Sequence, residues 1–237
     1  MNEILFKSIE QMPGLSFDCS CGRKHSVDIN NILIANNVLE KISGILSSYK
    51  DKKVFLFSDN NTYAVFGSKV YKYLVNNSFV VKNFIFNTGK THLIPDEKAL
   101  GRLLMELDPD TSYIIAVGSG TLNDLARIIS SRTKIPYMIV GTAPSMDGYA
   151  SVVSPLIIES FKKTFSGVYA HSIIGDVSIL KHAPMEMIHS GFGDILGKMT
   201  ALADWKLSKE INNEYYCPTC VAMVQNAIDK CISNIDG

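Results

Sequence analysis

The chain has 237 residues, of which 46% are hydrophobic and 19% are charged, and its formal net charge is zero. This composition predicts a well-buried core, and the zero net charge gives no electrostatic reason to expect a nucleic acid as partner. No apolar run is long enough to insert into a membrane, and Met1 to Phe6 lack the basic start of a signal peptide, so we expect a cytoplasmic protein.

Between residues 29 and 140, short apolar runs alternate with segments whose apolar residues recur every three or four positions. The runs predict buried strands, and the longer spacing predicts helices. In chain order, we expect strands at 54–57, 79–86, 113–117 and 137–140, and helices at 62–75, 98–107 and 122–131. Strands that are apolar throughout and alternate with helices are typical of a parallel sheet covered on both faces. The prediction is an α/β, Rossmann-like, doubly wound domain over residues 1–178.

The pattern changes after Pro184, where no further buried strand is expected. Helical spacing over Ile195–Leu207 and Val221–Ile232 predicts the beginning of an all-helical domain, assigned here to residues 179–237. Two or three helices alone would leave a poorly covered face, which suggests a fragment of a longer domain.

A glycine-containing turn follows the clearest strand and opens a helix, in the sequence Gly118-Ser119-Gly120-Thr121-Leu122-Asn123-Asp124. Small residues there let a phosphate approach backbone N–H groups at a helix N-terminus. The spacing is neither the six-residue dinucleotide fingerprint nor a Walker loop. Taken alone, the turn fits close packing about as well as nucleotide binding.

A second junction of small and hydroxyl residues follows the next strand, at Thr142-Ala143-Pro144-Ser145 and on to Asp147-Gly148. Ligands of open α/β sheets bind at the carboxyl ends of the strands. Two such junctions on successive strands therefore favour a nucleotide site, although Asp147-Gly148 alone fits an ordinary turn.

Asp194 begins an apolar helix in the segment Gly191 to Lys198. From spacing alone, an acid that stabilises the first helical turn is the simpler interpretation, and a ligand for a divalent metal is the alternative. The five histidines match no familiar ligand spacing.

The cysteines raise a separate possibility. Cys19 and Cys21 with His25, and Cys217 with Cys220, suggest a structural zinc site, because Cys-x-x-Cys is a metal half-site. The two groups fall in different predicted domains, and the first is Cys-x-Cys. Ordinary reduced cysteines are therefore the favoured interpretation.

Together, Gly118 to Asp124, Thr142 to Gly148, Gly191 to Lys198 and the following Thr200 to Trp205 resemble the sn-glycerol-1-phosphate dehydrogenases, in particular the bacterial branch encoded beside arabinose-utilisation genes. That family lies in the iron-containing alcohol dehydrogenase, glycerol dehydrogenase and dehydroquinate synthase-like superfamily. The resemblance covers nearly the whole chain and is weakest over the first thirty residues.

The resemblance implies a role for each matching residue. Asp59 would contact the adenosine side of NAD(P), Asp147 the substrate, and Asp194 both a divalent metal and the substrate. Lys198, one helical turn after Asp194, stands where some relatives of the superfamily have a metal-binding histidine, and we expect it to meet the substrate phosphate instead. The remaining cofactor contacts would come from Gly118, Ser119, Gly120, Thr121, Leu122, Asn123, Asp124, Thr142, Ala143, Pro144, Ser145 and Ser151.

The implied reaction is reversible, NAD(P)H-dependent reduction of dihydroxyacetone phosphate to sn-glycerol 1-phosphate, with zinc or nickel as Lewis acid and a homo-oligomer as the assembly. The family's two histidine ligands match no position before Gly237, so we expect the chain to be C-terminally truncated and weak in metal binding. Two alternatives stay open: a glycerol or polyol dehydrogenase or sugar-phosphate synthase of the same superfamily, and a nucleotide-binding module without catalysis.

Overall fold

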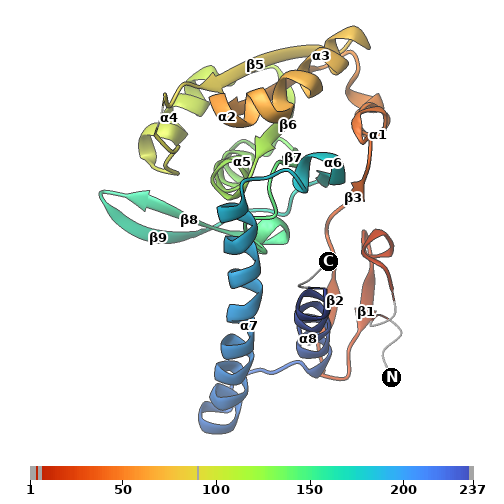
Figure 1. Cartoon of the computed structure of the whole chain (residues 1–237), viewed down its shortest axis with the longest axis vertical. Helices are drawn as coiled ribbons and strands as arrows, with labels where there is room; N and C mark the ends of the chain where they lie inside the picture. Colours follow the sequence, from red (N-terminus) through yellow and green to blue (C-terminus); the bar gives the residue numbers. More distant parts are fainter. Residues whose placement is uncertain (1–3, 5–6, 90, 235–237) are drawn as a thin grey trace.

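The computed structural model describes residues 4, 7–89 and 91–234 and is built around a six-stranded, all-parallel sheet (Figure 1). The strand order is β3–β10–β7–β6–β4–β5. The strands are β3 (Asn31–Ala35), β4 (Lys53–Asp59), β5 (Val80–Phe86), β6 (Thr111–Gly118), β7 (Tyr137–Gly141) and β10 (Ser172–Asp176).

Helices cover both faces of this sheet, which confirms the predicted doubly wound α/β class. On one face, α4 and α5 pack on a core cluster that includes Phe55, Phe57 and Ile114. On the other face, α1 and α3 pack on a cluster that includes Val54 and Leu56. Successive residues of β4 thus enter opposite cores, as the two-residue period of a strand requires. The helices are α1 (Leu39–Ile45), α2 (Asn60–Thr62), α3 (Ser68–Asn76), α4 (Glu97–Glu106) and α5 (Gly120–Thr133).

The four predicted strands and three predicted helices all occur, but their bounds and number differ in places. The helix expected at 62–75 is divided into α2, a π-helical segment at Tyr63–Gly67 and α3. The strands β3 and β10 were not predicted individually. An antiparallel hairpin of β8 (Val153–Ile158) and β9 (Phe161–Ser166) also lies outside the sheet.

Helices follow the last strand of the sheet, as predicted. They are α6 (Val177–Leu180), the long α7 (Met185–Asn212) and α8 (Pro218–Ser233). Met199, Leu207 and Ile211 of α7 are 51, 56 and 70% exposed, so the expected uncovered apolar face is present. Among the described helices, none combines the length and apolar character needed to cross a membrane.

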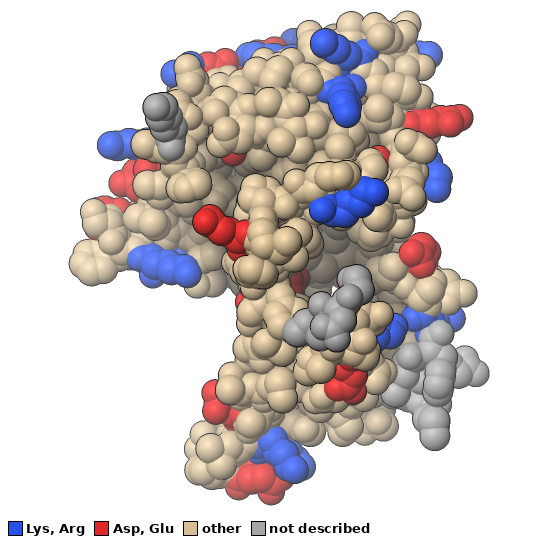
Figure 2. Space-filling view, in the orientation of Figure 1, with Lys and Arg blue, Asp and Glu red and all other residues tan. Residues whose placement is uncertain are grey.

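A small N-terminal hairpin of β1 (Ser16–Asp18) and β2 (Lys24–Ser26) is separate from the main sheet. Figure 1 shows it beside α8, away from the glycine turn. Short 3-10 turns occupy Ile9–Gln11, Ser47–Tyr49 and Gly148–Ala150. Figure 2 shows charged side chains of both signs dispersed over one face of the molecule rather than gathered in a single patch.

Candidate active site

The carboxyl ends of β4 and β6 form the topological switch point of the sheet. From β4 the chain proceeds outward to β5, whereas from β6 it proceeds in the opposite direction to β7 and β10. The helix after β4 packs on one face and the helix after β6 on the other. Open α/β sheets bind ligands in the crevice that this reversal creates. Asp59 ends β4, and Gly118 ends β6, so two predicted cofactor positions lie on the two sides of that crevice.

The glycine turn leaves little room for side chains at two positions. A Cβ added to Gly118 would overlap the Leu122 side chain, and one added to Gly120 would lie 3.2 Å from Met146 Sδ. Ser119 is the N-cap of α5, yet its side chain accepts no hydrogen bond from the helix. The Ser119 side chain therefore leaves the first N–H groups of α5 uncapped, which is the arrangement that receives a phosphate at a helix N-terminus.

Three of the predicted phosphate-cradling residues have side chains directed into the protein. Leu122 is 2% exposed and lies in the core, Asn123 is fully buried, and Asp124 is 9% exposed. The predicted contact of the stretch Gly120 to Asp124 with the cofactor stays a prediction, and these three residues could make it only through their backbone. Ser119 and Thr121 are only partly buried.

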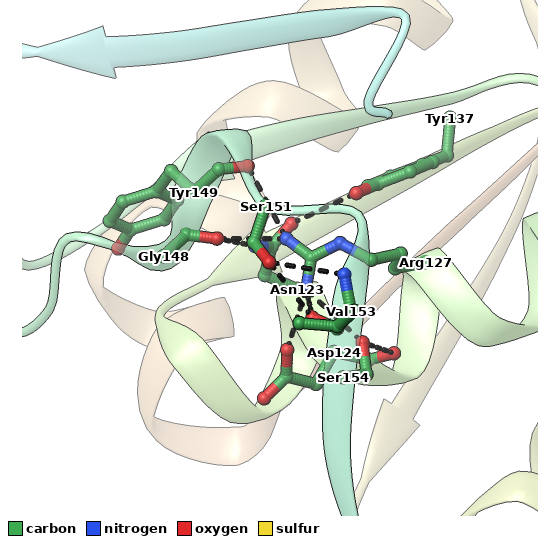
Figure 3. Close-up of polar contacts among 9 residues, drawn as sticks. All are labelled: Asn123, Asp124, Arg127, Tyr137, Gly148, Tyr149, Ser151, Val153 and Ser154. Atoms are coloured by element: carbon green, nitrogen blue, oxygen red, sulfur yellow. Dashed lines mark hydrogen bonds and ion pairs between the residues drawn. The ribbon is translucent and has the colours of Figure 1, made fainter. Parts of the chain in front are cut away.

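The side chain of Asp124 instead holds Arg127, a buried residue that the sequence analysis did not single out. Figure 3 shows the Arg127 guanidinium between α5 and the segment after the 3-10 turn. Its Nη1 lies 2.7 Å from Asp124 Oδ1 and donates to the Val153 carbonyl and Ser154 Oγ, and its Nη2 donates to the Gly148 carbonyl at 2.8 Å. Arg127 thereby fastens the segment that contains Asp147 and Ser151 to the helix that starts at the glycine turn.

The loop after β7 packs directly against the end of β6. The Thr142 N–H donates to the Gly118 carbonyl at 3.0 Å, and the Tyr149 hydroxyl donates to the Ala143 carbonyl at 2.7 Å. Ser151 is partly buried, and its Oγ donates to the Val153 carbonyl. Pro144 is exposed and Ser145 partly buried. Burial raises the pKa of the Tyr149 hydroxyl, so it stays protonated and keeps this bond.

A pocket of about 480 Å³ lies beside this loop, between the sheet and the start of α7. That volume is in the range of small-molecule sites. Thr142 and Ala143 are the predicted cofactor residues that line it; Lys69 and His182 are polar lining residues that the sequence analysis missed. The rest of the lining is Asn61, Thr62, Val65, Ser178, Ile179, Ala183, Pro184 and Met187.

Asp59 has a structural role at the edge of this pocket. Its Oδ1 accepts a hydrogen bond from the Thr62 N–H at 2.8 Å, and its own N–H donates to Thr62 Oγ1 at 3.1 Å. This reciprocal cap fixes the start of α2. Its predicted contact with adenosine stays a prediction.

Asp147, Asp194 and Lys198, which the sequence analysis assigned to the substrate, lie together. The Asp147 N–H donates to Asp194 Oδ2 at 2.9 Å, and Lys198 Nζ lies 2.8 Å from Asp147 Oδ2. The hydrogen bond from the Asp147 backbone lowers the pKa of Asp194, and the bond to Asp147 raises the pKa of Lys198. Asp194 and Lys198 are therefore charged near neutral pH.

Gly191 allows this cluster to form. A Cβ at Gly191 would overlap the Pro144 carbonyl, so α7 touches the loop after β7 only because this residue has no side chain. Asp194 and Lys198 follow within two turns of α7 and are thereby held against Asp147.

The residues around Asp194 do not make a complete metal site. Across residues 4, 7–89 and 91–234, the one group of three or more potential metal ligands is Cys19, Cys21, His25 and Cys217. Asp194 is thus without a set of three ligands, whereas a catalytic metal ordinarily has three. A catalytic metal at Asp194 does not fit the described residues alone.

Comparison with known proteins places the chain in a family. A family model for iron-containing alcohol dehydrogenases matches residues 33–184. The glycerol-1-phosphate dehydrogenase (NAD(P)+) of Halalkalibacterium halodurans is 33% identical over 238 residues, which cover 100% of this chain and 59% of that protein. The enzyme of the same name from Bacillus subtilis is 29% identical over 89% of this chain and 54% of its own length. The chain thus spans between half and three fifths of these relatives.

Solved structures agree on the fold. A glycerol dehydrogenase from Schizosaccharomyces pombe superimposes with a TM-score of 0.62 at 22% identity, covering 70% of this chain and 41% of that one. A 2-deoxy-scyllo-inosose synthase gives 0.58 at 17% identity, covering 77 and 52%. The switch-point crevice, the glycine turn and the family match over residues 33–184 agree, and the chain belongs to the iron-containing alcohol dehydrogenase family.

Proposed function

We propose that this chain forms the nucleotide-binding domain, residues 1–178, and one wall of the catalytic cleft of an NAD(P)-dependent sn-glycerol-1-phosphate dehydrogenase. The enzyme would transfer hydride reversibly between NAD(P)H and dihydroxyacetone phosphate. The observation that carries this proposal is the glycine turn at the switch point, with an α5 N-terminus that the Ser119 side chain does not cap. The names of the relatives support the substrate and the cofactor.

The dinucleotide would lie along the carboxyl edge of β4, β6 and β7. Its pyrophosphate would accept hydrogen bonds from the backbone at Ser119, Gly120 and Thr121, where the helix dipole favours an anion. The pocket lined by Thr142 and Ala143 offers space for the remainder of the cofactor. A loop fastened by Arg127 and Tyr149 would hold these contacts in place before the ligand arrives, which lowers the entropic cost of binding.

The substrate would bind beside Asp147, Asp194 and Lys198, on the α7 side of the crevice. Lys198 supplies a cation for the substrate phosphate, and it is oriented by its ion pair with Asp147. A divalent metal, zinc or nickel, would need ligands beyond Asp194. A homo-oligomeric assembly and a domain of helices from residue 179 are part of the same proposal.

Titration of the purified chain with NADH and with NADPH, followed by nicotinamide fluorescence, tests the nucleotide site. Gly120→Val should weaken binding more than about tenfold, which corresponds to about 1.4 kcal/mol, because its side chain would press on Met146 and crowd the backbone proposed to bind the phosphate. Gly101→Val is the matched control, since a Cβ at that exposed helical position meets no atom of the described residues within 4 Å, apart from the neighbouring backbone of α4. Equal affinities in the two variants would refute the assigned site.

Turnover tests the reaction separately. The chain and the Halalkalibacterium halodurans relative would be assayed with dihydroxyacetone phosphate and with dihydroxyacetone, with added Zn²⁺ or Ni²⁺. A dehydrogenase that needs the phosphate should reject the unphosphorylated ketone. Binding of NAD(P)H without any turnover by this chain would favour the second candidate, a nucleotide-binding module, which the incomplete ligand set at Asp194 supports.

A further inference from the structure

Four potential metal ligands from the two ends of the chain meet at one point. Cys19 and Cys21 lie in the turn of the β1–β2 hairpin, His25 lies on β2, and Cys217 is the N-cap of α8. Cys19 and Cys217 are 198 positions apart in sequence, yet the ligand atoms of all four residues lie within 4.8 Å of one another. The sequence analysis disfavoured a joint site because it placed these residues in different domains, and the structure removes that objection.

The distances between the ligand atoms match a tetrahedral zinc ion. With Zn–S of about 2.3 Å and Zn–N of about 2.0–2.1 Å, tetrahedral geometry places two sulfurs about 3.8 Å apart and a sulfur and a nitrogen about 3.5 Å apart. Cys19 Sγ lies 3.7 Å from Cys217 Sγ. His25 Nε2 lies 3.3 Å from Cys21 Sγ and 3.5 Å from Cys217 Sγ.

The surroundings of the sulfurs suit thiolate ligands. Thr219 Oγ1 lies 3.2 Å from Cys19 Sγ, the Tyr215 hydroxyl lies 3.1 Å from Cys21 Sγ, and the Cys220 N–H donates to Cys217 Sγ at 3.5 Å. Such outer hydrogen bonds orient metal ligands and stabilise their charge. Cys19 is 8% exposed and Cys217 is fully buried.

The backbone of the hairpin turn is shaped to hold two ligands close together. Gly22 has φ of +83°, a conformation that favours glycine, and its N–H donates to the Cys19 carbonyl at 3.0 Å. The Cys19 N–H in turn donates to the Arg23 carbonyl at 3.0 Å. The turn therefore directs Cys19 and Cys21 toward His25 on the returning strand.

The β1–β2 hairpin needs a stabilising cross-link in addition to its own hydrogen bonds. Its two strands have three residues each, and Ser16, Asp18, Lys24 and Ser26 are exposed. A two-stranded hairpin of this size is at best marginally stable in water.

A disulfide between Cys19 and Cys217 is not formed, because their sulfurs are 3.7 Å apart rather than about 2.05 Å.

We propose that Cys19, Cys21, His25 and Cys217 bind one structural zinc ion, which joins the N-terminal hairpin to the start of α8. Four protein ligands leave no open position, so the ion is structural rather than catalytic. The site is separate from the Asp147, Asp194 and Lys198 cluster and does not depend on the proposed dehydrogenase activity. Cys220, which completes the Cys-x-x-Cys pattern, is outside the ligand set.

Metal analysis of the chain, purified under reducing conditions and exposed to Zn²⁺ before desalting, tests this site. We expect about one zinc per chain in the wild type and in Asp194→Ala, and release of that zinc when a mercurial reagent titrates the thiols. Removal of zinc by a chelator should lower the Tm. Because these measurements use correctly folded protein, they do not depend on any cysteine variant being stable.

Substitutions then identify the ligands. Cys217→Ser and Cys21→Ser should lose the zinc, whereas Cys220→Ser and Cys231→Ser, the matched thiol controls, should retain it. Co²⁺ in place of zinc should give the charge-transfer absorption of a thiolate-bound, tetrahedral ion in the wild type. A wild-type chain that takes up no zinc, or zinc that is lost with Asp194→Ala and kept in Cys217→Ser, would overturn the proposal.

Discussion

Gly191→Ala should destabilise the protein, although alanine ordinarily stabilises a helix. The added Cβ overlaps the Pro144 carbonyl and would lie 2.9 Å from the Pro144 carbonyl carbon, and a backbone group cannot rotate away as a side chain can. Overpacking costs about 1–3 kcal/mol, and a rigid backbone neighbour places this case at the upper end. The gain in helix propensity offsets about 1 kcal/mol of that cost. The net loss in the free energy of unfolding should be about 2 kcal/mol.

Gly193→Ala, two residues further along α7, is the control. Apart from the neighbouring backbone of α7, no atom of the described residues lies within 4 Å of a Cβ at Gly193, so the gain in helix propensity should stabilise the variant by about 0.5–1 kcal/mol. Urea unfolding of both variants and the wild type measures the two effects. If Gly191→Ala is as stable as Gly193→Ala, then α7 does not depend on close approach to the loop after β7, and the explanation given for the Asp147–Asp194 contact is wrong.

Two further perturbations test the interior and the charge cluster. Arg127→Met should lower the free energy of unfolding by about 3–5 kcal/mol, because it leaves Asp124 buried without its partner. Arg132→Met, at an exposed position of the same helix, is the control and should change that free energy by less than about 0.5 kcal/mol. Similar urea midpoints for the two variants would refute the role of Arg127. The pKa of Asp194 is lower in the folded state than its value of about 3.9 in the unfolded state. The ionised carboxylate therefore adds to the free energy of unfolding above about pH 3.9, and this contribution is lost as the pH falls through the folded-state pKa. The stability difference between the wild type and Asp194→Asn, measured by urea unfolding, should therefore be largest near neutral pH and shrink below about pH 4, and a difference that grows in acid would contradict the assignment.

The glycine turn could be predicted because everything that defines it is local. Val117, Gly118 and Gly120 lie in one strand–turn–helix unit, so apolar periodicity and residue size are sufficient to place it. The fold class followed from the same alternation of strands and helices. β3 and β10 were harder, because β3 is an edge strand that is at most partly buried and β10 has only two large apolar residues, Ile173 and Ile174. The two strands pair with each other across about 140 positions of the chain.

Arg127 and the contact between Cys217 and Cys19 could not be predicted from the sequence, because both depend on residues that are far apart in the chain. Arg127 donates hydrogen bonds to Gly148, Val153 and Ser154, which come close to it only after the chain folds back onto α5. An arginine in an otherwise apolar helix segment is a signal that could have drawn attention to it. Cys217 meets Cys19 through a contact across most of the chain, which no local pattern encodes.

The parallel pairing of β3 with β10 explains how the two ends of the chain meet. The hairpin precedes β3 and therefore lies toward the amino edge of the sheet, whereas α7 begins after β10, at the carboxyl edge. A five-residue strand is about 17 Å long, while the 28 residues of α7 extend about 42 Å. Figure 1 shows that α7 starts near α6 and extends away from the sheet, and that α8 lies beside the hairpin of β1 and β2. Gly191 fixes this helix at the crevice and the cysteine–histidine cluster fixes the segment that follows it at the far end, so the position of Asp194 is determined from both sides.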